Sequence, residues 1–169
     1  MRTRTHLFIL AIVLMTVSVS VATAQETPVV LSGAELTRVV PLGFYFEGQS
    51  APTQMRNAAA ARFGSKRYAI AGLVDTSGYS TEVRAKYQGF LITDSKVSVG
   101  GKELSAGAYG FGFSEDGKFN VFDVGGKELM SVNASKDTAM RRPRPLMMSI
   151  EGGALRLYAE RSYVTIAAK

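Results

Sequence analysis

The side chains that could do chemistry in this chain are acidic, basic and aromatic, because imidazoles and thiols are almost absent. The 169-residue sequence contains a single histidine, His6, and it has no cysteine and no tryptophan. His6 lies in the N-terminal segment that is predicted below to be cleaved. The remaining chain has no histidine, so it cannot form Ser-His or Cys-His pairs for nucleophilic catalysis. Zinc sites need Cys or His ligands. The sequence therefore predicts no metal and no cofactor, and it leaves carboxylate chemistry and binding by arginine or tyrosine.

The motif closest to a catalytic signature is LVDTSG at residues 73–78. Aspartic proteases carry Asp-Thr-Gly after an apolar strand, and two such aspartates share one proton. Here a serine intervenes, the glycine comes one place late, and the chain has no second copy. The sequence favours a turn in which Asp75 bonds the backbone two residues on and Gly78 adopts a positive φ.

Paired carboxylates could also hydrolyse glycosides. Asp123 is the most unusual acidic residue, because it lies among apolar residues in VFDV at 121–124. Nothing in the sequence selects a pair, and solvated surface charge is the commoner role. The candidates are Glu47, Asp75, Glu82, Asp94, Asp123, Glu128, Glu151 and Glu160.

Binding residues are predicted in two places. Arg141, Arg142 and Arg144 form the densest basic stretch, RRPRP, which either holds an anionic ligand or lipid headgroup or is an exposed connector. The connector is favoured, because prolines extend the chain there. The aromatic residues should mostly form the core, and they line a ligand cavity only if the strands close around one. The candidate ligand-binding residues are Tyr79, Tyr87, Tyr109, Arg141, Arg142, Arg144, Asp75 and Asp123.

The first 24 residues have the pattern of a secretory signal peptide. Arg2 and Arg4 precede an apolar run at residues 7–21, and Ala22-Thr23-Ala24 supplies small residues for cleavage. An uncleaved anchor is the disfavoured alternative, because the run is shorter than a spanning helix requires. Cleavage removes His6 and lowers the formal net charge from +6 to +4. That charge is too mild to predict nucleic-acid binding.

The rest of the chain reads as short strands separated by glycine turns, which must position these residues. In the hairpin at 108–124, Tyr109, Phe111 and Phe113 share one face, and the intervening glycines leave the other face bare for close backbone approach. The turn is SEDG at 114–117, and a second glycine turn is expected at 151–153. Other strands are expected at residues 39–47, 66–74, 87–93, 96–99, 129–132, 146–150, 154–159 and 163–166.

Some segments are less determined. Residues 53–63 have high helix propensity, with four consecutive alanines, yet the same segment could be a strand that turns at Gly64-Ser65. Residues 80–86 should form one or two helical turns capped by Ser80. The repeated VGGKEL at 99–104 and 124–129 is interpreted as two turns at the same end of neighbouring hairpins.

The predicted fold is therefore all-β: one antiparallel β-barrel or β-sandwich of about eight or nine short strands, with at most one or two short helices. The expected organisation is a signal peptide at 1–24, a lead-in at 25–37 and one β-domain at 38–169.

Five stretches carry a resemblance to a group of exported, β-rich bacterial proteins of the Acidobacteria type. They are AGLVDTSGYS at 71–80, KYQGFLIT at 86–93, GGKELSAGAYGFGFSEDGKFNVFDVGG at 100–126, RRPRPL at 141–146 and RLYAERSYVTI at 156–166. The resemblance implies export and an all-β fold. It implies no activity, substrate or catalytic residue.

These observations predict an exported, non-catalytic β-domain that binds a ligand or partner or is structural in the cell envelope. Two alternatives are a carboxylate-based hydrolase, of glycosidase-like or atypical aspartic type, and a small outer-membrane β-barrel. The expected partner is a small molecule or an envelope component, with no nucleic acid and with membrane contact only through the signal segment. The expected location is the periplasm or the extracellular space.

Overall fold

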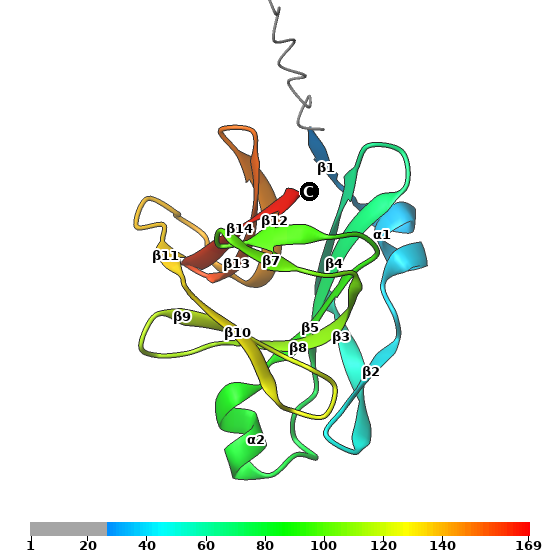
Figure 1. Cartoon of the computed structure of the whole chain (residues 1–169), viewed down its shortest axis with the longest axis vertical. Coiled ribbons are helices and arrows are strands. Elements are labelled where there is room, and N and C mark those ends of the chain that lie inside the picture. Colours follow the sequence, from blue (N-terminus) through cyan, green and yellow to red (C-terminus); the bar gives the residue numbers. More distant parts are fainter. Residues whose placement is uncertain (1–26) are drawn as a thin grey trace, which may run out of the picture.

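The computed structural model describes residues 27–169, which form two antiparallel sheets and two short helices (Figure 1). The prediction of an all-β fold is confirmed; of the two predicted forms, barrel or sandwich, the structure is sandwich-like, and the described residues form 14 strands where eight or nine were expected. The predicted signal peptide at residues 1–24 lies outside the described residues. Among the described residues, neither helix is long and apolar enough to cross a membrane.

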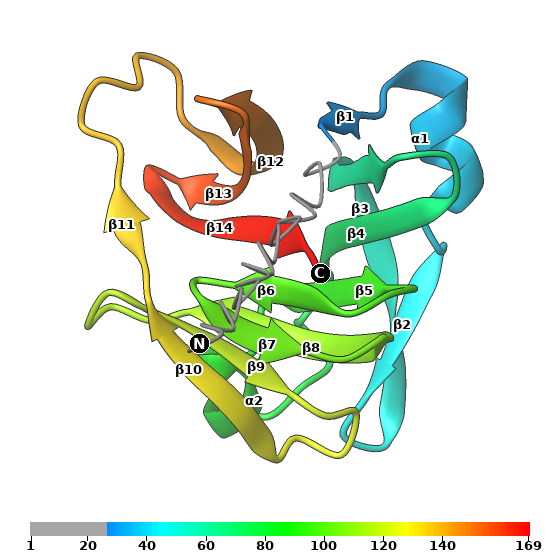
Figure 2. The ribbon, with the colours of Figure 1, turned by 45° about the horizontal axis from the view of Figure 1, so that its top comes forward.

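The larger sheet has eight strands and the smaller sheet has six. In spatial order the larger sheet contains β1 (Pro28–Val30), β3 (Gln49–Phe63), β4 (Arg67–Val74), β5 (Gly89–Thr93), β8 (Gly107–Phe113), β9 (Lys118–Phe122) and β10 (Glu128–Asn133), and β2 (Gly43–Phe46) pairs with β3. The smaller sheet contains β12 (Arg144–Glu151), β13 (Ala154–Glu160), β14 (Ser162–Ala168), β6 (Val97–Val99) and β7 (Lys102–Leu104), and β11 (Ser135–Lys136) pairs with β14 (Figure 2). The helices are α1 (Gly33–Val39) and α2 (Thr81–Lys86).

A largely aliphatic core fills the space between the two sheets. Alternate residues of β13, Leu155 and Leu157, are fully buried against Leu91, Phe111 and Phe119 of the larger sheet. Side chains alternate across a strand, so one face of each sheet supplies this core. We call it the inter-sheet core.

A second core lies on the opposite face of the larger sheet. The β2–β3 hairpin and α2 cover that face, and six aromatic side chains are buried beneath them. We call this group the aromatic cluster; it consists of Phe44, Phe46, Tyr79, Tyr87, Phe90 and Phe122. The larger sheet is therefore buried on both faces over part of its area.

The glycines of the predicted hairpin explain how the second core approaches the sheet. A Cβ at Gly110 would lie 2.4 Å from the ring of Phe46, and a Cβ at Gly112 would lie 2.0 Å from the backbone oxygen of Lys86. Both distances are far below normal contact. The predicted close approach is confirmed, and the turn also forms as expected, with Gly117 at φ 81°.

Residues 53–63 form a strand, not a helix. They belong to β3, which pairs with β4 from Ala58 to Phe63 across the predicted turn at Gly64. Ala59 and Ala61 are buried in the inter-sheet core, whereas Ala60 is buried on the other face. Burial on both faces of the sheet therefore overrides the helix propensity of four alanines.

Two expectations about local structure need revision. From residue 27 onward, the predicted lead-in contains β1, which pairs with β3, and the start of α1 at Gly33. Helix α1 buries none of its residues and Ser32 makes no side-chain cap, so the sequence carries little signal for it. The VGGKEL repeats do not lie at one end of neighbouring hairpins. The first joins β6 to β7 in the smaller sheet, and the second joins β9 to β10 in the larger sheet.

Candidate functional site

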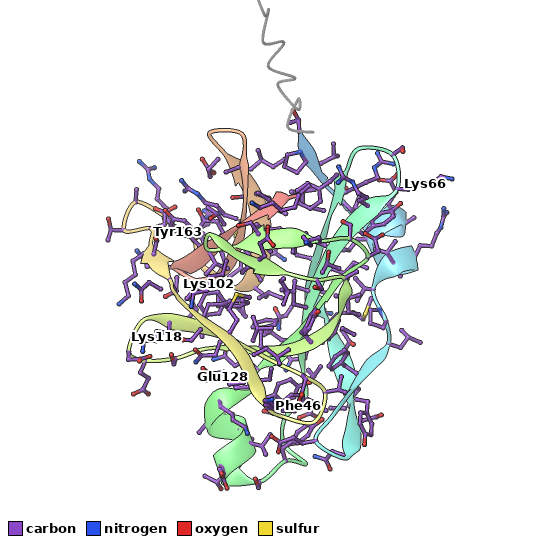
Figure 3. The ribbon with its side chains drawn as sticks, viewed as in Figure 1. Phe46, Lys66, Lys102, Lys118, Glu128 and Tyr163 are labelled. Atoms are coloured by element: carbon purple, nitrogen blue, oxygen red, sulfur yellow. The ribbon has the colours of Figure 1, made fainter. Side chains whose placement is uncertain are left out.

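Tyr79 and Tyr87, two of the predicted binding residues, belong to the aromatic cluster. The ring of Tyr87 stacks on Phe46 at 3.9 Å between centroids, and Tyr79 meets Tyr87 edge-on at 5.4 Å. Both tyrosines are buried, and Figure 3 shows Phe46 between β2 and α2. Helix α2 forms here as predicted, because Ser80 accepts a hydrogen bond from the amide of Val83 at 3.3 Å. The cluster is a packed core and not a lined cavity.

The two tyrosine hydroxyls in this cluster differ in their partners. Tyr79 donates to the backbone oxygen of Gln49 at 3.2 Å. The Tyr87 hydroxyl is buried and has no hydrogen-bond partner among the described residues. Burial, followed by the nearby Tyr79, raises the pKa of Tyr87 well above its usual range, and burial also raises the pKa of Tyr79. Both phenols are neutral at physiological pH.

One ion pair closes the aromatic cluster at its edge. Lys86 Nζ lies 2.7 Å from Glu47 Oε1 and 5.7 Å from the centroid of the Phe122 ring. It also donates to the backbone oxygen of Gly126 at 3.5 Å. Glu47 has a positive φ of 44° in the β2–β3 turn. These contacts tie the β2–β3 turn, α2 and the β9–β10 turn together, so they stabilise the fold.

Tyr109, Asp75 and Asp123 also have structural roles. Tyr109 donates to the backbone oxygen of Ser105 at 3.0 Å. Asp75 accepts from the amide of Ser77 at 3.0 Å, which lowers its pKa, and this confirms the predicted turn. Gly78 is not at positive φ, so that detail of the prediction is wrong. Asp123 accepts from the amides two and four residues later, at 3.0 and 2.9 Å, and so organises the β9–β10 turn.

The basic stretch is exposed, in agreement with the favoured connector interpretation. Arg141 and Arg142 lie in the loop between β11 and β12, and Arg144 begins β12. The ladder between β12 and β13 shifts register after Arg144, where Pro145 has no amide hydrogen to donate. Tyr87 lines the end cleft described below, whereas none of the three arginines does.

A cleft that sequence reasoning did not predict opens at one end of the sandwich. Its volume is about 480 Å³, and both sheets and α2 contribute to its walls. We call it the end cleft. It is lined by Gln54, Leu73, Val74, Thr76, Arg84, Tyr87, Gln88, Phe113, Ser114, Glu115, Pro145, Ala159, Glu160 and Ser162. The volume lies within the range of small-molecule sites.

The polar groups of the end cleft are of two kinds. Some are already used by the fold: Gln88 donates to the backbone oxygen of Phe113 at 3.1 Å and accepts from its amide at 3.0 Å, as another strand residue would. Others keep their hydrogen-bonding capacity. The side chains of Glu115, Glu160 and Ser162 have no hydrogen bond or ion pair within residues 27–169. These groups are available to a ligand.

Glu160 is held in an unusual backbone conformation. It occupies the two-residue turn between β13 and β14 with a φ of 54°. This left-handed region favours glycine, and a residue with a side chain is strained there. The turn places the Glu160 side chain at the wall of the end cleft, together with Arg84 and Glu115, which come from other elements. Backbone strain of this kind is concentrated at functional sites.

The carboxylate-hydrolase alternative required two of its eight candidate carboxylates in one pocket. The end cleft contains one of them, Glu160, together with Glu115 of the β8–β9 turn. A second pocket of about 500 Å³, near Pro28 and Leu155, has no acidic side chain in its walls, and neither has a third of about 400 Å³, near Met55 and Met148. Over residues 27–169, no three His, Cys, Asp or Glu side chains form a group that could hold a metal.

The fold defines an all-β protein of two antiparallel sheets, and the end cleft is a pocket between them whose walls combine apolar surface with polar side chains that the fold does not use. Comparisons with protein-family models, with curated proteins and with solved structures found no match. The resemblance to exported Acidobacteria-type proteins therefore stays a prediction.

Proposed function

We propose that the protein is an exported, non-catalytic binding domain that holds a small polar molecule in the end cleft. The observation that carries this proposal is the set of unused polar groups on the cleft walls. Glu115 and Glu160 are acceptors without a donor among the described residues, and the Arg84 guanidinium donates one hydrogen bond, to the Thr81 hydroxyl at 3.3 Å.

The cleft chemistry indicates the kind of ligand. Arg84 supplies donors, the two glutamates supply acceptors, and Ser162 can do both. Leu73, Phe113 and Pro145 add apolar surface to the same walls. A ligand with donors and acceptors around a small apolar part fits this combination. Such pockets use a few polar groups to orient a ligand that apolar surface binds.

Export is supported by the sequence. The signal-peptide pattern precedes the described residues, and the chain has no cysteine that would have to remain reduced or be paired. On this proposal the ligand is a molecule of the periplasm or of the external medium.

Native mass spectrometry of protein purified from the exported fraction tests the proposal. We expect an added mass on the wild type, and loss of that mass in Ala159→Trp, because Ala159 lines the end cleft and an indole would fill it. The matched control is Ala108→Trp, at an exposed position of β8 outside the cleft, which should keep the mass. An added mass that persists in Ala159→Trp, or no added mass on the wild type, would contradict the proposal.

A further inference from the structure

A second surface of interest lies at the turn between β13 and β14, where basic side chains gather. Lys136 of β11 is paired with Ser162 on one side of this turn, and Arg144 of β12 is paired with Glu160 on the other. The loop at 137–143 connects β11 to β12 around the turn (Figure 2). Five basic residues therefore share this place, which we call the basic corner: Lys136, Arg141, Arg142, Arg144 and Arg161.

The charge of the basic corner is not compensated. All five side chains are exposed, and none forms an ion pair or a side-chain hydrogen bond within the described part of the chain. Two acidic residues, Asp137 and Glu160, lie in the same segments, so residues 135–144 and 160–162 together carry a formal charge of +3. The chain from Gln25 onward carries +4, so these segments contribute +3 of that net charge and the remaining residues contribute +1.

Hydrogen bonds of Asp137 fix the loop that carries Arg141 and Arg142 to strand β13 and the β13–β14 turn. The Asp137 carboxylate accepts from the amides of Ala139 and Met140, at 3.0 and 3.1 Å, and from the hydroxyl of Tyr158 at 3.3 Å. The Asp137 amide donates to the backbone oxygen of Arg161 at 2.8 Å.

Tyr158, which donates to Asp137, also contacts neighbouring side chains on the outer face of the smaller sheet. Tyr158 is 1% exposed, and it accepts from Arg156 Nη1 at 3.1 Å. The Arg156 guanidinium lies 4.4 Å from the centroid of the Tyr163 ring, and Figure 3 shows Tyr163 beside β11. Asp137 forms no ion pair with the arginines of the corner among the described residues, and its negative charge is already counted in the +3. The loop therefore presents its guanidinium groups on a fixed base.

The arrangement fits phosphate groups spread over a surface. Guanidinium groups bind phosphate through two parallel hydrogen bonds and lose their hydration easily. All five basic side chains are exposed, so the corner spreads its charge over an open surface and does not enclose a single anion. Exposed, clustered basic residues instead match the phosphate layer of an anionic membrane. We propose that the basic corner docks the protein onto the headgroup phosphates of an anionic lipid bilayer, independently of the end cleft.

Co-sedimentation with vesicles tests this docking. The protein is the chain from Gln25 onward, which includes every element of both sheets and both cores, and the vesicles contain phosphatidylcholine alone or with phosphatidylglycerol. We expect binding only to the anionic vesicles, and loss of it when NaCl rises from about 0.1 M to about 0.5 M. The double variant Arg141→Gln/Arg142→Gln should bind on the order of 30-fold more weakly.

The matched control is Lys66→Gln/Lys127→Gln. It removes the same charge from two lysines in other turns, and Figure 3 shows Lys66 on the side away from Tyr163. This variant should bind the vesicles as the wild type does. Equal losses in the two double variants, or binding to soluble polyphosphate without binding to anionic vesicles, would overturn the proposal. Unchanged melting temperatures would show that both variants are folded.

Discussion

The aromatic cluster and the end cleft lie close together in the structure, since Tyr87 belongs to both, yet their side chains are used in opposite ways. In the cluster the rings are packed against one another, as in the 3.9 Å stack of Phe46 on Tyr87. In the cleft, the carboxylates of Glu115 and Glu160 have no hydrogen-bond or ion-pair partner within residues 27–169. The rings of the cluster stabilise the fold, whereas these two carboxylates of the cleft remain available to a ligand.

In this chain, residue type alone does not distinguish core side chains from those that are available to a ligand. Tyrosines suggested binding, but Tyr79 and Tyr87 are buried core residues. The end cleft is lined instead by residues of ordinary types, from strands, α2 and turns, whose positions depend on how the two sheets meet. Substitutions in the aromatic cluster should therefore change stability, whereas substitutions in the end cleft should change ligand retention.

Phe46→Ala should destabilise the protein by about 3–5 kcal/mol, because the ring is fully buried and its removal leaves a cavity among its aromatic neighbours. Urea denaturation followed by circular dichroism measures the loss. The exposed neighbour Tyr45, which is 54% exposed on the same strand, provides the control, and Tyr45→Ala should cost far less. Similar losses in both variants would show that the cluster is not a core.

Gly112→Ala should cost about 2 kcal/mol, because the new Cβ would lie 2.0 Å from the backbone oxygen of Lys86 and one segment would have to move. Gly78→Ala is the control, since its Cβ would have an ordinary contact of 3.8 Å with Gln49. We expect a lower denaturation midpoint only for Gly112→Ala. If the two midpoints agree, the close approach of α2 to β8 is contradicted.

Glu160→Gly should stabilise the protein by about 1 kcal/mol, because glycine adopts a φ of 54° without steric cost. The same change should weaken ligand retention in the cleft. Glu115→Gly removes the other cleft carboxylate at a position without positive φ, so it should weaken retention without stabilising. Thermal denaturation distinguishes the two variants, because only Glu160→Gly should raise the melting temperature. A destabilised Glu160→Gly would argue against a strained cleft residue.

Tyr87→Phe should change stability at neutral pH by less than about 0.5 kcal/mol, because the lost hydroxyl has no partner among the described residues. A difference in stability between the variant and the wild type is expected only at alkaline pH. The pKa of Tyr87 is raised in the folded state above its ordinary value of 10.0, so the wild type is fully stabilised below that value and loses stability as pH rises beyond it. Denaturation midpoints at about pH 9 and about pH 11 should diverge, with the Tyr87→Phe variant the more resistant to alkali. If the denaturation midpoints of the wild type and Tyr87→Phe change equally between the two pH values, the Tyr87 hydroxyl is exposed to solvent and the assignment of a buried hydroxyl is wrong.

Much of the fold was predictable from local patterns. The alternation of aromatics and glycines at 109–113 predicted a bare sheet face, and the structure packs Phe46 and α2 against it. Ser80 predicted a helix start that the structure confirms. Residues 53–63 were left open, because burial of β3 depends on segments that are distant in sequence, such as β1, which pairs with it, and β12, whose Leu146 and Met148 share a core with Ala59 and Ala61. The seven-residue α1 was missed because it buries no side chain that would create a periodic pattern.

The candidate site was less predictable than the fold. Its walls come from β3, β4, α2, the β8–β9 turn and the β13–β14 turn, which are brought together only by the packing of the sheets. Of the predicted binding residues, only Tyr87 lines the cleft. Glu160 was considered only as one of eight candidate carboxylates. A signal was available in residues 160–162, the short connection between the strands predicted at 154–159 and 163–166, because tight hairpin turns often require a positive φ.

The most direct test of the central claim is a map of amide chemical-shift changes when the small-molecule extract of the exported fraction is added to isotopically labelled protein. We expect the changes at Thr76, Arg84, Glu115, Glu160 and Ser162, around the end cleft. The amides of Phe44 and Phe90, deep in the aromatic cluster, should not shift. Shifts centred on the aromatic cluster, or no shifts at all, would contradict the assignment of binding to the end cleft.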